Sequence, residues 1–253
     1  MDESKGKKPV SKSVYILPNL FTVGSMFCAF WGLLMAHGEN FTGCAIAILV
    51  SALLDGMDGK IARLTHSASD FGVQLDSLAD AIAFGATPAY MILLWQLHSL
   101  GRLGMAVSFL FMACGALRLA RFNVMAGTSA SKKFFTGLPI PAARCALSCL
   151  VLFQNYLPPS IYPILTWFTL ALTFALGLLM VSRVPYFAFK DFSGIRLKTF
   201  SMMVILVVVF ALIIVEPKLF GFSFFLAYLL SGPLYSLWLY SKKSGRKGGK
   251  SAE

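Results

Sequence analysis

Charged residues are scarce in this chain, and acidic residues are the scarcest. Of the 253 residues, 13% are charged and only 11 are Asp or Glu, whereas 57% are hydrophobic. A soluble domain normally carries about a quarter charged residues, so this composition excludes a separate soluble domain. The three histidines form no H-x-K motif, which argues against phospholipase D-like enzymes. The five cysteines form no C-x-x-C pair, so the sequence supports neither a zinc site nor a disulfide framework.

Long uncharged runs are what the chain has instead. Windows of about 20 mostly apolar residues recur along its length, and each is enough for a helix to cross a bilayer. The spans that this pattern predicts are 18–37, 41–63, 73–98, 101–124, 139–157, 161–182, 199–215 and 219–240. We therefore expect an all-α fold, a polytopic transmembrane bundle of about eight helices. The bundle forms one domain over residues 14–241, with basic tails at 1–13 and 242–253.

The basic residues gather on alternate connecting segments. The predicted outer loops hold only Arg102 and Lys218, and the inner segments hold Lys5, Lys7, Lys8, Lys12, Lys60, Arg63, Lys132, Lys133, Arg183, Lys190, Arg196 and Lys198. By the positive-inside rule, both termini lie in the cytoplasm, and we expect an integral protein of a prokaryotic inner membrane. Anionic lipid headgroups suit the net charge of +11, so nucleic acid is not needed to explain it.

One stretch, LLDGMDGKIARLTHSASDFGVQLDSLAD, concentrates acids at the predicted cytoplasmic end of the second and third helices. Carboxylates at the edge of hydrocarbon are costly, by roughly a few kcal/mol each. Asp55 and Asp58 are three residues apart and Asp76 and Asp80 four apart, so each pair projects from one helix face. Two such faces opposed across a hairpin would place the four carboxylates around one cavity. Divalent Mg²⁺ or Mn²⁺ in that cavity would neutralise their charge.

The residues between these acids suit a ligand that carries phosphate. Gly59 and Ala62 keep one side of the second helix shallow, and Arg63 can reach a phosphate with charge-assisted hydrogen bonds. Ser69 offers a hydroxyl in the linking loop. Capping at a solvated helix end would explain Asp70, but it does not explain the spaced acids together with the glycines and the arginine.

The whole stretch reads D-x2-D-G-x2-A-R-x8-G-x3-D-x3-D, which is similar to the signature of the CDP-alcohol phosphotransferase family. The resemblance implies that a CDP-linked donor binds with its pyrophosphate on two metal ions, Mg²⁺ or Mn²⁺, that an alcohol attacks phosphorus, and that CMP leaves. Asp55 and Asp76 would then touch both ions, Asp58 one and Asp80 the other. Asp80 would also be the general base. The donor CDP-diacylglycerol would contact Asn19, Gly59, Ala62, Arg63 and Ser69. The family also implies a homodimer.

Three further stretches resemble the branch of that family that uses L-serine as acceptor. They are LPNLFTVGSMFCAF, then GALRLARFNV with FTGLPIPAA, and MVSRVPYFAFK. The resemblance points to an acceptor site that includes Arg118, Arg121, Asn123, Arg183 and Lys190. Arg118 and Lys190 could equally be anchors that reach the lipid headgroups, and this alternative stays open.

Other functions are compatible with part of the pattern. The acceptor could instead be inositol or glycerol 3-phosphate, because the aspartate motif is shared across the family. Membrane prenyltransferases also use paired aspartate motifs, but these lie much farther apart in sequence. A divalent-cation transporter would carry its acids near mid-membrane rather than at one face. Release of CMP from CDP-diacylglycerol separates the enzyme from the transporter.

Overall fold

The structure is a computed structural model of the full chain. It describes residues 16–65, 69–126, 134–182 and 184–187, together with 223, 226–229 and 231–232. The helices in this part of the chain are α1 (Ile16–His37), α2 (Phe41–Leu64), α3 (Asp70–Asp80), α4 (Thr87–Trp95), α5 (Arg102–Ala126), α6 (Ile140–Phe153) and α7 (Tyr162–Val181). The predicted spans 199–215 and 219–240 lie outside it, apart from a few helical residues at 223–232.

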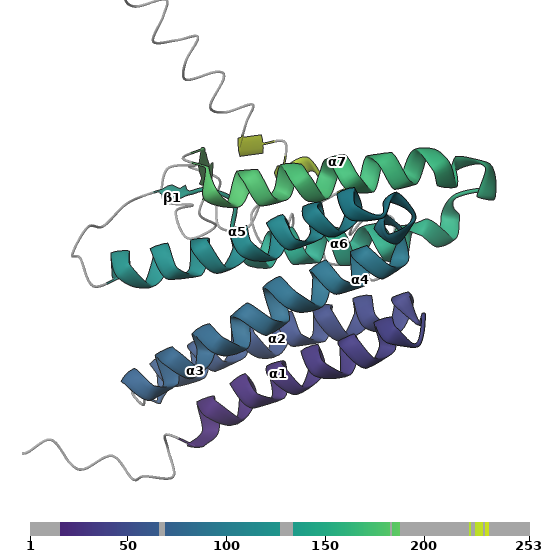
Figure 1. Cartoon of the computed structure of the whole chain (residues 1–253). Coiled ribbons are helices and arrows are strands. Elements are labelled where there is room, and N and C mark those ends of the chain that lie inside the picture. The colour runs from purple at the N-terminus through teal and green to yellow at the C-terminus, as the bar shows by residue number, and fades with distance from the viewer. Residues whose placement is uncertain are drawn as a thin grey trace, which may run out of the picture.

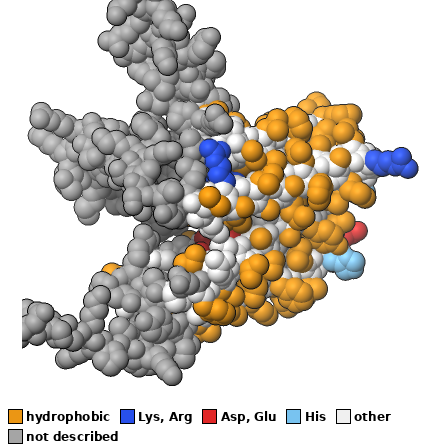
Figure 2. Space-filling view, turned by 60° about the vertical axis from the view of Figure 1, so that its left-hand side comes forward, with side chains coloured by type: hydrophobic (Ala, Val, Ile, Leu, Met, Phe, Trp, Pro, Cys, Tyr) orange, Lys and Arg blue, Asp and Glu red, His pale blue; other side chains and the backbone are white. Residues whose placement is uncertain are grey.

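The expected polytopic helical fold is confirmed. In the described residues, 5 helical segments are long and apolar enough to cross a membrane. Large hydrophobic side chains such as Phe27, Leu53 and Phe109 are more than 60% exposed on their outer faces. Figure 2 shows these hydrophobic side chains as a broad surface along the helices, with charged groups at the ends. Such a surface is unfavourable in water and favourable in lipid, which is why the helices can leave it uncovered.

The helices form two groups that share one core. Helices α1 and α2 pack along each other, α5 packs on α7, and α6 lies against α2 between the two groups (Figure 1). Close approach of α5 and α7 depends on Gly177, where an added Cβ would lie 3.5 Å from the Phe111 Cα. Small residues at such crossings let helix backbones approach within a membrane.

Helix α6 is shorter than the span predicted at 139–157. It contains 14 residues, Ile140–Phe153, and continues into a short 3-10 turn at Gln154–Tyr156. Every residue from Ala143 to Leu152 is buried. A helix of this length does not cross about 30 Å of hydrocarbon by itself. The helical run Ile140–Tyr156 therefore agrees with the predicted bounds, but hydropathy does not tell a core helix from a lipid-facing one, so the burial of this segment was not predicted.

The predicted third span, 73–98, is one helical run with a change of pitch. Between α3 and α4 lies the π-helical segment η2 (Ala81–Ala86). Pro88 in the first turn of α4 has no N–H to donate to the carbonyl four residues earlier, which explains why the regular ladder fails here. The Thr87 N–H donates to the Ile82 carbonyl, five residues earlier, and the Thr87 hydroxyl donates to the same carbonyl at 3.1 Å. The change of pitch begins directly after Asp80, and π-helical turns are frequent at functional sites.

The sequence reading did not predict a short strand pair, in which one strand precedes α6 and the other follows α7. Strands β1 (Phe134–Thr136) and β2 (Pro185–Phe187) pair antiparallel, with Phe135 opposite Tyr186. Gly137 then turns the chain toward α6 with a φ of 87°. Its N–H donates to the Val184 carbonyl at 2.9 Å. These bonds tie the start of α6 to the end of α7.

Candidate metal and phosphate site

The site lies at one end of the bundle, where α1 and α3 begin and α2 ends. Helices α1 and α2 are joined at the other end by the tight turn Gly38–Asn40, so they run antiparallel. The acids that end α2 and the first residues of α1 therefore reach the same end. Because α3 also packs on α1, all three helices contribute side chains there.

The aspartates of α2 and α3 meet as the spacing predicted. Carboxylate oxygens of Asp55, Asp76 and Asp80 lie within 4.8 Å of one another, and all three side chains are partly buried. The Asp80 Oδ1 atom is buried and has no hydrogen-bond partner among the described residues. Carboxylates this close repel one another when ionised, and a divalent cation with oxygen ligands relieves that repulsion. This geometry fits a metal ion.

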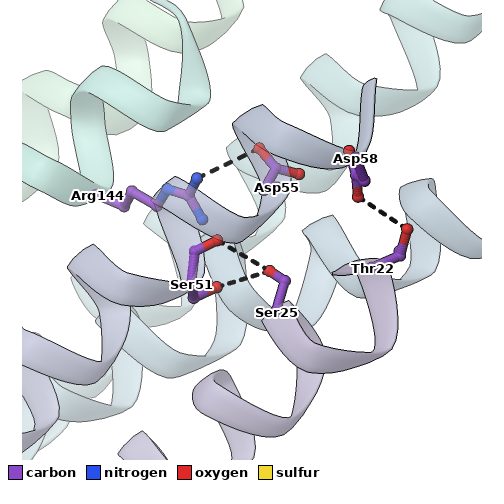
Figure 3. Close-up of polar contacts among 6 residues, drawn as sticks. All are labelled: Thr22, Ser25, Ser51, Asp55, Asp58 and Arg144. Atoms are coloured by element: carbon purple, nitrogen blue, oxygen red, sulfur yellow. Dashed lines mark hydrogen bonds and ion pairs between the residues drawn. The ribbon is translucent and has the colours of Figure 1, made fainter. Parts of the chain in front are cut away.

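Asp58 stands apart from that group. Its side chain is 6% exposed, and its Oδ2 accepts a hydrogen bond of 2.8 Å from the Thr22 hydroxyl of α1 (Figure 3). The sequence reading placed Asp58 with the other three around one cavity, and that role stays a prediction. It also missed Thr22, which lies three residues after Asn19 and therefore on the same helix face.

A second polar contact, one turn deeper, aligns α1 with α2. The hydroxyls of Ser25 and Ser51 lie 2.8 Å apart, and the Ser25 hydroxyl is also 3.1 Å from the Ser51 carbonyl (Figure 3). Both side chains are buried. Inside a bundle without water, a satisfied pair of this kind stabilises one register of the two helices. The register brings Thr22 level with Asp58.

The start of α3 brings together two of the residues expected near the donor, Asn19 and Ser69, on either side of Gly72. Ser69 is the N-cap of α3, and its Oγ accepts a 3.0 Å hydrogen bond from the Gly72 N–H. A Cβ on Gly72 would lie 3.2 Å from both the Asn19 Oδ1 and the Ser69 Oγ. Gly72 therefore lets α1 approach the cap closely. In this cap the Ser69 oxygen is the acceptor, so the hydroxyl can still donate its proton.

Gly59 presents open space beside α2. A Cβ added there would meet nothing within 4 Å in the part of the chain that the structure describes, the neighbouring turns of α2 aside. Packing within the described chain therefore does not require a glycine at this position, which agrees with the prediction that a ligand approaches the backbone here. The helix continues through Ala62 and Arg63, whose side chains lie outside the described residues.

Of the predicted acceptor residues, Arg118 and Asn123 on α5 interact with residues of α3. Asn123 donates from Nδ2 to the Ser77 hydroxyl of α3 at 2.9 Å, which holds the end of α5 against α3. The Nε of Arg118 is buried without a partner in the described part of the chain, and Arg118 interacts electrostatically with Asp80. Arg121 donates from Nη1 to the Val181 carbonyl of α7 at 3.5 Å. Arg183 and Lys190 lie outside the described residues.

The sequence reading also missed Arg144, on α6. This side chain is completely buried, and its Nη2 lies 3.5 Å from the Asp55 Oδ2 (Figure 3). A signal was available, because a charged residue within an apolar helix is by default a functional candidate. The sequence reading grouped basic residues by loop, and Arg144 is not in a loop.

The fold and the site together define a class, an integral membrane protein with a carboxylate cluster at one end of its helices. Residues 15–175 match the family described as CDP-alcohol phosphatidyltransferase, and the chain belongs to that family. The predicted resemblance is therefore confirmed.

Relatives along most of the chain share one name. A "CDP-diacylglycerol–serine O-phosphatidyltransferase" of Helicobacter pylori strain 26695 is 39% identical over 234 residues, which cover 90% of this chain and 94% of the relative. A protein of the same name from Bacillus subtilis strain 168 is 32% identical over 187 residues, covering 72% and 96%.

Proposed function

We propose that this chain transfers the phosphatidyl group from CDP-diacylglycerol to L-serine, giving phosphatidylserine and CMP. The observation that carries the proposal is the group of three carboxylates that α2 and α3 bring within 4.8 Å, in a chain of this family. The choice of serine rests on relatives named for that acceptor, one of which aligns with 90% of the chain.

We further propose that Asp55, Asp76 and Asp80 hold Mg²⁺ or Mn²⁺, and that Asp58 completes a site for two ions. Oxygen ligands are those that both cations prefer, and the buried, unpaired Asp80 Oδ1 is a ligand atom without another role in the described structure. When bound, the ions would neutralise the negative charge that develops on the phosphate oxygens. Thr22 orients Asp58 through the hydrogen bond to its Oδ2.

Asp80 is the proposed general base. A serine hydroxyl is a weak nucleophile at neutral pH, and a carboxylate that takes its proton accelerates attack by about 10²–10⁴-fold. The serine oxygen forms a bond to the phosphorus that carries diacylglycerol, while the bond from that phosphorus to the CMP oxygen breaks. CMP leaves with the bonding electrons, and the proton resides on Asp80. No covalent intermediate with the protein is required.

The two substrates would approach from different sides of the carboxylates. The donor would contact Asn19 and Ser69, which flank Gly72 at the start of α3, and Gly59 on α2. Ala62 and Arg63 follow on α2. The acceptor carboxylate would meet the α5 cations, Arg118 and Arg121, beside Asn123. Arg183 and Lys190 stay predicted acceptor residues, and a homodimer in a prokaryotic inner membrane stays the expected state.

The test is a parallel assay on the purified protein. CDP-diacylglycerol and Mg²⁺ or Mn²⁺ are supplied with serine, inositol or glycerol 3-phosphate, and both CMP and the lipid product are measured. We expect CMP and phosphatidylserine with serine alone, and no turnover in chelator. CMP release with another acceptor would reassign the acceptor within the family. No CMP release under any condition would contradict the enzyme and favour the cation transporter.

A further inference from the structure

Arg144 is a buried cation that the proposed reaction does not use. It stands on the first turns of α6, and its side chain is 0% exposed. Its guanidinium carbon lies 3.1 Å from the centroid of the Phe84 ring, which comes from η2 directly after Asp80. The aromatic face and the aspartates hold Arg144 between α6, α2 and the π-helical segment.

The hydrogen-bonding capacity of this guanidinium is almost wholly unused. Nε, Nη1 and Nη2 have no hydrogen-bond partner within the residues that the structure describes. The adjacent Cys145 thiol is at most a weak acceptor. A buried arginine normally satisfies several of its five donors, so this one is not held by a polar network. What remains to compensate its charge is the Phe84 ring and the carboxylates.

The carboxylates need a positive charge when no metal is bound. Asp55 lies 3.5 Å from Arg144, and the charge of Arg144 also interacts with that of Asp80. Three carboxylates within 4.8 Å of one another destabilise the fold unless a cation is near them. We propose that Arg144 is the internal counter-ion of the metal-free site, a positioning residue that holds Asp55 in place and opposes metal binding.

This inference rests on the proposed metal site. It predicts that loss of the Arg144 side chain strengthens metal binding instead of weakening it. Removing the guanidinium removes a positive charge beside the metal position, so divalent cations bind more tightly. The metal-free protein becomes less stable at the same time, because the carboxylates lose their counter-ion. A purely structural arginine would lower stability equally with and without metal.

The first test is a double-mutant cycle in chelator, where no metal contributes. Thermal unfolding is measured for the full chain in detergent as wild type, Arg144→Met, Asp55→Asn and the double variant. Each single variant leaves one buried charge unpaired, so each lowers the Tm, and the double variant loses less than the sum of the two. If the losses in Tm are additive, Arg144 and Asp55 do not interact, and the proposal is overturned. Arg144→Gln repeats the cycle with a polar side chain if the Met variant does not fold.

The second test is Mn²⁺ binding, followed by the electron paramagnetic resonance signal of the free ion. We expect Arg144→Met to bind Mn²⁺ about tenfold more tightly than wild type, from the loss of repulsion between the two cations. Its Tm should also rise more on adding Mn²⁺. Arg144→Lys keeps the charge and should stay near the wild-type affinity. Equal or weaker binding by Arg144→Met would overturn the proposal.

Ser148→Ala is the matched control, since Ser148 is buried one turn further along α6 and its hydroxyl has no partner in the described residues. It should leave unchanged both the coupling between Arg144 and Asp55 in the double-mutant cycle and the Mn²⁺ affinity. If wild type itself binds no Mn²⁺, the metal site of the proposed function fails and the claim that Arg144 opposes the metal fails with it. If wild type binds Mn²⁺ but Arg144→Met behaves like the control, only this inference fails.

Discussion

Single residues of α2 and α3 perform most of the proposed chemistry, and their charges are the most direct target. We expect Asp76→Asn to abolish turnover, because it removes a ligand charge from the group within 4.8 Å. Changes that only support a metal ligand typically cost about 10–100-fold, so loss of a ligand should cost more. Product formation is measured over a range of Mn²⁺ concentrations. Glu39→Gln, an exposed acid at the other end of the bundle, is the control. Wild-type activity of Asp76→Asn at limiting metal would contradict the site.

The effect of changing Asp80 should differ from the effect of changing the other acids. Asp80→Asn keeps the size and one carbonyl oxygen but loses the proton acceptor. We expect serine turnover to fall by about 10²–10⁴-fold while CDP-diacylglycerol still binds. Equilibrium binding of the donor is measured beside the rate. Loss of donor binding as complete as in Asp76→Asn would make Asp80 chiefly a metal ligand.

Two glycines of α2 give a matched test of the donor surface. Neither Gly56 nor Gly59 has an atom within 4 Å of an added Cβ, and Ala should favour the helix over Gly at both by up to about 1 kcal/mol. Only Gly59 belongs to the predicted donor contact. We expect Gly59→Ala to raise the apparent KM for CDP-diacylglycerol about tenfold or more, since a methyl group would displace the ligand from the backbone. Gly56→Ala should change it little. Equal effects at the two positions would remove Gly59 from the donor site.

At the scale of elements, the turn before α6 determines where Arg144 stands. Gly137 has a φ of 87°, and an added Cβ would lie 2.5 Å from the Met180 carbonyl oxygen and 3.0 Å from that of Ser182. We expect Gly137→Ala to lower the free energy of unfolding by about 1–3 kcal/mol, from backbone strain and the contact with rigid carbonyls. Gly101→Ala is the comparison, because Gly101 also has positive φ but nothing within 4 Å. It should lose less, as measured by thermal unfolding. An equal loss would mean that the carbonyl contacts do not matter.

The π-helical segment shows how an element can orient a site from a distance. Residues Ala81–Ala86 wind more widely than an α-helix, so Phe84 faces a direction that a regular helix would not give it. There its ring meets Arg144. Pro88 is visible in the sequence, but an interior proline can end, kink or widen a helix. Helix α1 packs beside the wide turn, where its Ala29 carbonyl accepts a hydrogen bond of 3.3 Å from the Thr87 hydroxyl.

For the whole molecule, orientation in the membrane is the main prediction to test. The positive-inside rule puts the Asp55 end of the bundle in the cytoplasm. We expect a cysteine at Ser99, which is exposed at the other end, to react with a membrane-impermeant maleimide in intact cells. A cysteine at Leu64, which is 81% exposed at the site end, should react only after the membrane is permeabilised. The reverse pattern would invert the topology. The unmodified protein is the background control, since its cysteines all fall within predicted spans.

The sequence by itself determined the class of fold, the family and the principal acids. Apolar runs of about 20 residues predict membrane helices because bilayer thickness is fixed. Asp55, Asp76 and Asp80 could be grouped because helical spacing and a short hairpin leave little choice of geometry. Both signals are local in the chain, so no knowledge of packing was needed.

Only the tertiary structure decided which distant residues complete that site. Thr22 and Arg144 lie far in sequence from the acids they contact, at 2.8 Å and 3.5 Å, and their positions depend on how α1 and α6 pack on α2. The same packing made α6 a short buried helix and turned Phe84 toward Arg144. Hydropathy and periodicity measure each helix separately. Helix packing depends on close contacts between faces that are all apolar, and single-residue patterns do not distinguish such faces.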